Sequence, residues 1–218
     1  MIKLLIKLLA GILSIPVALA VSVSFYNNII LVKELAGSLN FFLWGIGTYV
    51  IIHLLFYKPT YLYVLGHETV HAGIAWLFGG KIKKFKVSGK GGSVATDKSN
   101  FIIELGPYFV PIYAIIITVV YFVISSSYNI NGRTFIFLIG FALAFHLIST
   151  IEVMKIRQPD IVKSGYFFSV VLIYVLNIIV ISVIFGLLFP SFSIQKFFVG
   201  CWLVTKHAYL VITKQMFF

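Results

Sequence analysis

The residues with the clearest chemical meaning are two histidines and a glutamate in the stretch Gly66-His67-Glu68-Thr69-Val70-His71. Two histidines four positions apart on a helix project from the same face, so both imidazoles can bind one zinc ion. Glu68 then lies beside the metal, where it can take a proton from an activated water molecule and return it to a leaving amine. The motif therefore indicates a zinc metalloprotease site, with His67 and His71 as metal ligands and Glu68 as catalytic base.

A catalytic zinc ion normally has three protein ligands, so a third ligand must lie outside the motif. A single cysteine excludes a site built from several thiolates. A carboxylate suits the site better than a third imidazole, because it compensates the charge of the ion where the dielectric constant is low. Two acids are plausible as the third ligand: Glu104, beside the Gly106-Pro107 break, and Asp160. The less plausible candidates are Glu34, His53, Asp97, His146 and Glu152.

Both acids also have an ordinary structural interpretation. Glu104 could pair with a lysine or cap a broken helix, and Asp160 follows a proline and could cap the helix after it. The residues alone do not choose between the two as metal ligand.

The composition predicts that lipid surrounds much of the chain. Of its 218 residues, 61% are apolar and 11% are charged, and the mean hydropathy is +1.06. Soluble domains are far less apolar. The net charge is +11, but the basic residues form no stripe interleaved with polar residues, so we expect no nucleic-acid partner. In membrane proteins an excess of lysine and arginine usually lies in cytoplasmic loops. We expect an integral, multi-pass protein of the bilayer.

The apolar runs predict an all-α polytopic membrane protein with about six transmembrane helices. A signal-peptidase-like Ala18-Leu19-Ala20 lies in the first run, but the run continues past it and favours a retained helix over a cleaved signal peptide. A further apolar run, 194–212, suits either a spanning or an interfacial helix. The six expected spans are residues 4–26, 41–57, 61–78, 101–124, 134–153 and 165–188.

The most polar stretch, residues 81–100, follows the motif helix directly. Its alternating apolar and lysine residues around Gly89-Lys90-Gly91-Gly92 predict a small β-hairpin. Pro107 and Pro111 interrupt the next span, and a broken helix persists in a membrane only beside protein or a water-filled cavity. The length leaves no room for a separate soluble domain. We therefore expect one membrane-embedded metalloprotease-like domain over 1–218, with a core of about 61–190.

The order of these features resembles the site-2 protease family of intramembrane zinc metalloproteases. The resemblance covers about residues 61–177: the HExxH helix, the glycine-rich hairpin, the Gly-Pro break and a later aspartate before another span. Residues 79–109 and 157–169 also look like a family of small bacterial membrane proteins related to these proteases. The resemblance implies zinc held by His67, His71 and Asp160, with Glu68 as base, and a location in the bacterial cytoplasmic membrane.

Two positions depart from the family pattern. Val110 stands where an asparagine is common, and Pro159-Asp160-Ile161 replaces the usual Leu-Asp-Gly. The function expected from the resemblance is hydrolysis of a peptide bond in or near the transmembrane segment of a protein substrate. The alternative is a non-proteolytic membrane protein with a structural or transport-related zinc site. Glu68 favours the enzyme, because a structural site needs no general base between its histidines. The pattern predicts no oligomeric state.

Overall fold

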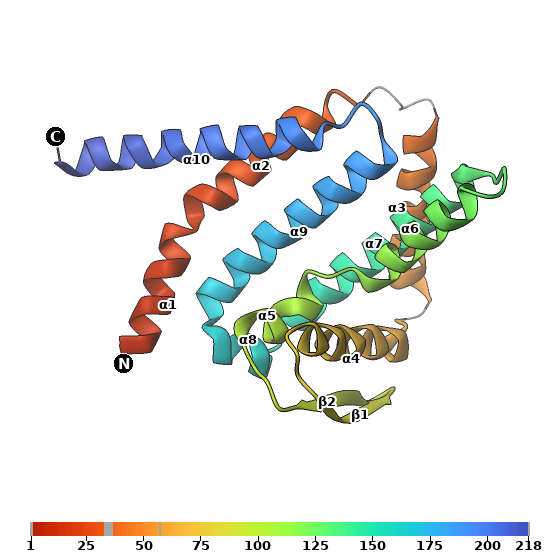
Figure 1. Ribbon diagram of the computed structural model, residues 1–218, viewed down its shortest axis with the longest axis horizontal. Helices are drawn as coiled ribbons and strands as arrows, with labels where there is room; N and C mark the ends of the chain where they lie inside the picture. Colours follow the sequence, from red (N-terminus) through yellow and green to blue (C-terminus); the bar gives the residue numbers. More distant parts are fainter. Residues whose placement is uncertain (1, 33–36, 57, 218) are drawn as a thin grey trace. The chain divides into compact units, whose positions relative to one another are not determined.

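The chain is mostly helical and carries one β-hairpin (Figure 1). The structure is a computed structural model that describes residues 2–32, 37–56 and 58–217, so Glu34 lies outside the described residues. Two compact units make up the chain. One spans Ala36–Asp160, and the other combines Met1–Leu35 with Ile161–Phe218. The single domain expected from the sequence stays a prediction.

The unit of residues 36–160 contains all the candidate site residues that the structure describes. Its elements are α3 (Ser38–Leu55), α4 (Thr60–Leu77), β1 (Ile82–Ser88), β2 (Gly91–Thr96), α5 (Phe101–Leu105), the 3-10 helix η2 (Gly106–Tyr108), α6 (Ile112–Ser125) and α7 (Gly132–Met154). The short helix α8 (Pro159–Ser164) begins at its end. The core includes Tyr49, Ala144 and Phe145, with Tyr63 and Tyr113 packed against them.

Helices α3 and α7 pack closely, because glycines face the backbone of the partner helix. A Cβ added at Gly45 would lie 2.0 Å from the carbonyl oxygen of Phe137. A Cβ added at Gly140 would lie 2.2 Å from the carbonyl oxygen of Phe42. Small residues at helix contacts let two backbones approach, as is common in membrane-embedded bundles.

The expected hairpin is confirmed. Strands β1 and β2 pair antiparallel through the turn at Gly89 and Lys90, with an irregularity between Ile82 and Lys84. Both strands contact α4, and Figure 1 shows them alongside that helix. The hairpin therefore lies against the helix that carries the HExxH motif.

The span expected at 101–124 is broken, as its prolines predict. Helix α5 begins after Asn100, whose side chain caps it by accepting hydrogen bonds from the amides of Ile102 and Ile103. The segment then tightens into η2, and the chain bends by 76° between Phe101–Tyr108 and Ile112–Ser125. Pro111 precedes α6 directly.

The other unit consists of α1 (Ile2–Leu13), α2 (Ile15–Ile29), the remainder of α8, α9 (Tyr166–Leu188) and α10 (Ile194–Phe217). Helices α1 and α2 form one nearly continuous apolar segment, with Pro16 in the first turn of α2. Helix α2 packs against α9 and α10. The hydroxyl of Tyr209 donates a hydrogen bond to the carbonyl oxygen of Leu13, which ties α10 to α1.

The apolar helices support a membrane protein, but the count of about six spans is not confirmed. Within the described ranges, four segments are long and apolar enough to cross a membrane, and a fifth is added if the bent pair is one span. The four are Leu5–Ile29, Ser38–Leu55, Gly132–Met154 and Tyr166–Leu188. Helix α4, expected to span, is not among them. The polar residues of the HExxH motif lower its mean hydropathy.

The glycine contact between α3 and α7 can be tested within one helix. Gly45→Ala should lower the thermal unfolding midpoint in detergent, because the added methyl meets the α7 backbone; overpacking costs roughly 1–3 kcal/mol. Gly47→Ala is the matched control, because a Cβ there meets nothing within 4 Å and alanine favours a helix. Equal midpoints for the two variants would contradict the close packing.

Candidate metal centre

Helix α4 brings the two motif histidines together. The Nε2 atoms of His67 and His71 lie 3.2 Å apart, and the two rings meet edge to face with centroids 4.8 Å apart. Both imidazoles are largely buried. This is the arrangement expected from a spacing of four on a helix, because residues i and i+4 lie one turn apart on one face.

Asp160 reaches the same point from the start of α8. Its Oδ2 atom lies 3.5 Å from His71 Nε2 and 3.9 Å from His67 Nε2. Among the described residues, these three form a group of possible ligands whose atoms all lie within 4.8 Å of one another. The structure therefore brings together the three residues that the sequence motif and the family resemblance singled out as metal ligands.

The three atoms fit the dimensions of a zinc site. Nitrogen and oxygen ligands lie about 2.0–2.1 Å from a tetrahedral zinc ion, which places neighbouring ligand atoms roughly 3.3 Å apart. The observed separations of 3.2, 3.5 and 3.9 Å are close to this value. Two imidazoles and one carboxylate are also a donor set found in catalytic zinc sites.

A proline break orients His71. The Nδ1 of His71 lies 2.7 Å from the carbonyl oxygen of Ile103 in α5. In an uninterrupted helix this carbonyl would accept from the amide of residue 107, but Pro107 has no N–H. The freed carbonyl can instead accept a hydrogen bond from His71 Nδ1–H. That leaves the Nε2 lone pair directed at the metal position, a common arrangement for metal-binding histidines.

A tyrosine one turn before the motif contacts His67. The Tyr63 hydroxyl lies 3.2 Å from His67 Nδ1, so it can fix the ring in the same tautomer as His71. Sequence reasoning did not single out Tyr63, although its spacing of four from His67 places the two on one helix face.

The Asp160 carboxylate is held in its ionised form. Burial alone would raise the pKa of this carboxyl, but when His71 is protonated rather than bound to a metal, its hydrogen bond and charge outweigh burial, so the pKa lies below its usual value. The fully buried Tyr108 donates to Asp160 Oδ2 over 3.5 Å, and its ring meets that of His67 edge to face. A deprotonated carboxylate is the form that binds a metal cation. Nothing in the sequence indicated the contact between Tyr108 and Asp160.

Glu68 is covered by the hairpin. Its side chain is only 7% exposed, and it lies between the two histidines along α4. A Cβ added at Gly92 of β2 would lie 2.5 Å from Glu68 Cγ and 2.7 Å from Glu68 Oε1. The strand can approach the glutamate this closely only because residue 92 has no side chain. The hairpin therefore forms one wall of the site.

The acidic alternatives have other partners. Glu104 accepts a hydrogen bond of 2.7 Å from the Ser99 hydroxyl and does not belong to the group of three ligand atoms. Asp97 accepts a hydrogen bond of 2.7 Å from the backbone amide of Lys81, at the base of the hairpin.

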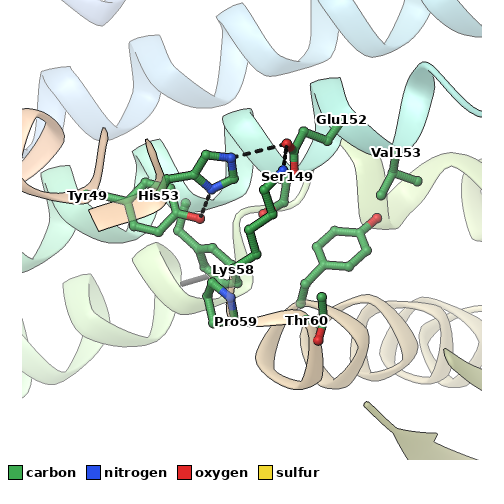
Figure 2. Close-up of a pocket in the computed structure, with 10 residues that line it drawn as sticks. Tyr49, His53, Lys58, Pro59, Thr60, Ser149, Glu152 and Val153 are labelled. Atoms are coloured by element: carbon green, nitrogen blue, oxygen red, sulfur yellow. Dashed lines mark hydrogen bonds and ion pairs between the residues drawn. The ribbon is translucent and has the colours of Figure 1, made fainter. Parts of the chain in front are cut away.

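His53 and Glu152 belong to a separate polar cluster. His53 lies between Tyr49 and Glu152 (Figure 2). All three residues line a cavity of about 90 Å³. His53 Nε2 lies 3.2 Å from Glu152 Oε1, and the Lys58 ammonium group contacts the same oxygen. His146 lines a smaller cavity of about 20 Å³ next to His67, but it is not one of the three clustered ligands.

Comparison of the chain with protein-family models, curated proteins and solved structures gives no match. The resemblance to the site-2 protease family therefore stays a prediction from the motifs. The candidate metal centre rests on the residues of this chain and on their geometry.

The choice of third ligand can be tested by metal content. Asp160→Ala should weaken zinc binding by more than about tenfold, since even changes outside the ligand set often cost 10–100-fold. Glu104→Ala is the matched control and should retain zinc, because Glu104 is hydrogen-bonded to Ser99 and is not part of the group of three ligands. Zinc bound per protein is measured on both purified variants by elemental analysis and by chelator competition. If Asp160→Ala retained full zinc content and Glu104→Ala bound no zinc, Glu104 would be the third ligand instead.

Proposed function

We propose that the protein is an intramembrane zinc endopeptidase, with His67, His71 and Asp160 as metal ligands and Glu68 as general base. The observation that carries this proposal is the convergence of two imidazole nitrogens and one carboxylate oxygen. A glutamate lies beside the first histidine on the same helix. The proposal extends to the cofactor, the substrate class and the location in the bacterial cytoplasmic membrane.

The number of ligands supports catalysis over a purely structural role. In the described part of the chain, the group holds three ligand side chains, whereas structural zinc sites usually have four. A tetrahedral ion with three protein ligands keeps one position for water or substrate. A structural site also has no need of a general base between its two histidines.

Each residue has a distinct task in peptide hydrolysis. When bound, zinc polarises the scissile carbonyl and makes water a stronger acid. Glu68 accepts the proton of the attacking water and delivers it to the amide nitrogen as the C–N bond breaks. His71, oriented by the Ile103 carbonyl, and His67, oriented by Tyr63, hold their Nε2 atoms in place. The wall at Gly92 limits access of bulk water to Glu68.

The surrounding helices support a substrate from the membrane. The unit that holds the site also holds α3 and α7, both apolar and long enough to span, and the bent pair of α5–η2 and α6. A broken helix beside the site leaves backbone N–H and C=O groups without helical partners. An extended substrate segment can lie beside the break and form hydrogen bonds with these groups. We therefore propose the transmembrane segment of another protein as substrate, cleaved within or next to the bilayer.

The test is the Glu68→Gln variant, which keeps the size of the side chain and removes its basicity. It should retain zinc and lose nearly all cleavage of a model transmembrane substrate; loss of a general base typically costs 10²–10⁴-fold in rate. The variant and the wild-type protein are assayed in the same detergent, and zinc content is measured in parallel. Near-normal cleavage by Glu68→Gln would refute its role as base. Zinc bound by wild-type protein that cleaves no substrate would favour the structural or transport alternative.

A further inference from the structure

The β-hairpin and its flanking residues carry a concentration of positive charge. Residues 81–98 contain six lysines and one acid, a net charge of +5. Among the residues that the structure describes, Lys83, Lys84, Lys86 and Lys90 form no ion pair within the chain. All four are exposed. The function proposed above makes no use of this charge.

The register of the hairpin shows which way Lys84 and Lys86 point. Gly92 pairs with Val87, and Gly92 faces Glu68 of α4. Successive residues of a strand point to opposite faces, so the next pair, Lys86 with Ser93, points away from α4. The pair Lys84 with Ala95 lies on the same outer face. Small partners leave the lysine side chains uncovered.

Exposed apolar side chains lie close to these lysines along the chain. Trp76, Leu77 and Phe78 are exposed at the end of α4 just before the hairpin, and Phe85 is exposed between Lys84 and Lys86, on the opposite face of β1. Aromatic residues and lysines together are typical of the boundary between lipid and water, where long lysine stems lie along apolar surface and their ammonium groups stay in water.

The chain path keeps the hairpin near the bilayer. Strand β2 ends at Thr96, and the bent pair of helices that can form a span begins at Phe101. Four residues can bridge at most roughly 14 Å. Lys84 pairs with Ala95 at this end of the hairpin, so the lysines of β1 lie close to the start of the span and within reach of lipid headgroups, whose anionic members attract basic segments.

We propose that the β1–β2 hairpin docks on the anionic headgroups of the bilayer through Lys84 and Lys86 of its outer face, together with the exposed Lys83 at the strand irregularity beside them. The occupant is a phospholipid surface that carries net negative charge, because an excess of lysine next to a membrane span complements it. This inference does not depend on the proteolytic function. Docking also restrains the strand whose Gly92 packs on Glu68, so the lipid surface and the candidate site share one element.

The test uses the full chain in lipid nanodiscs with one fluorescent label on the outer face of the hairpin. Ser93→Cys receives an environment-sensitive dye, and Cys201→Ser removes the natural thiol. Discs contain either phosphatidylcholine alone or phosphatidylcholine with phosphatidylglycerol. The emission should shift to the blue in the anionic discs only. The shift should reverse at high salt, because screening shortens from about 10 Å at 0.1 M to about 3 Å at 1 M.

Charge variants decide whether these lysines cause the shift. The triple change Lys83→Gln, Lys84→Gln and Lys86→Gln should abolish it, whereas the three corresponding changes to Arg should preserve it. Lys196→Gln, Lys206→Gln and Lys214→Gln together remove the same charge from α10 and should leave the shift intact. Equal emission in both discs would overturn the proposal. A blue shift that survives the hairpin Gln changes would overturn it too.

Discussion

The hydrogen bond between His71 and the Ile103 carbonyl is the constraint on which the arrangement of the site depends. It exists because Pro107 cannot donate to that carbonyl, so the break in the helix and the orientation of the ligand have one cause. The same break places Tyr108 in η2, where its hydroxyl reaches Asp160. One proline therefore links the motif helix, the broken span and the third candidate ligand.

Glycines allow neighbouring elements to pack closely against α4. A Cβ at Gly106 would lie 2.2 Å from Ile74 Cδ1, and a Cβ at Gly66 would lie 2.8 Å from the ring of Tyr113. Gly92 gives the same access to Glu68 from the hairpin side. A helix with three ionisable residues in little more than one turn is costly in a membrane. Close packing from several sides gives these residues partners other than lipid, and the proposed metal ion would add another.

The sequence predicted the features that follow from local periodicity. The spacing of His67 and His71 places both on one helix face, and the Gly-rich lysine stretch forms the expected hairpin. Features that depend on packing between distant parts of the chain could not be predicted in this way. The residues alone did not choose between Glu104 and Asp160 as the third ligand. The contact of Tyr108 with Asp160 joins residues 52 positions apart, so no local pattern indicates it. The count of about six spans is not confirmed, since the polar motif that marks the site also lowers the hydropathy of α4.

The coordination sphere of the metal-loaded protein at atomic resolution tests the central claim most directly. We predict one zinc ion bound by His67 Nε2, His71 Nε2 and one Asp160 oxygen at about 2.0–2.1 Å, with a water molecule in the fourth position. The water should lie within hydrogen-bonding reach of Glu68. A fourth protein ligand in place of the water, or a sphere that excludes Asp160, would contradict a catalytic centre of this kind.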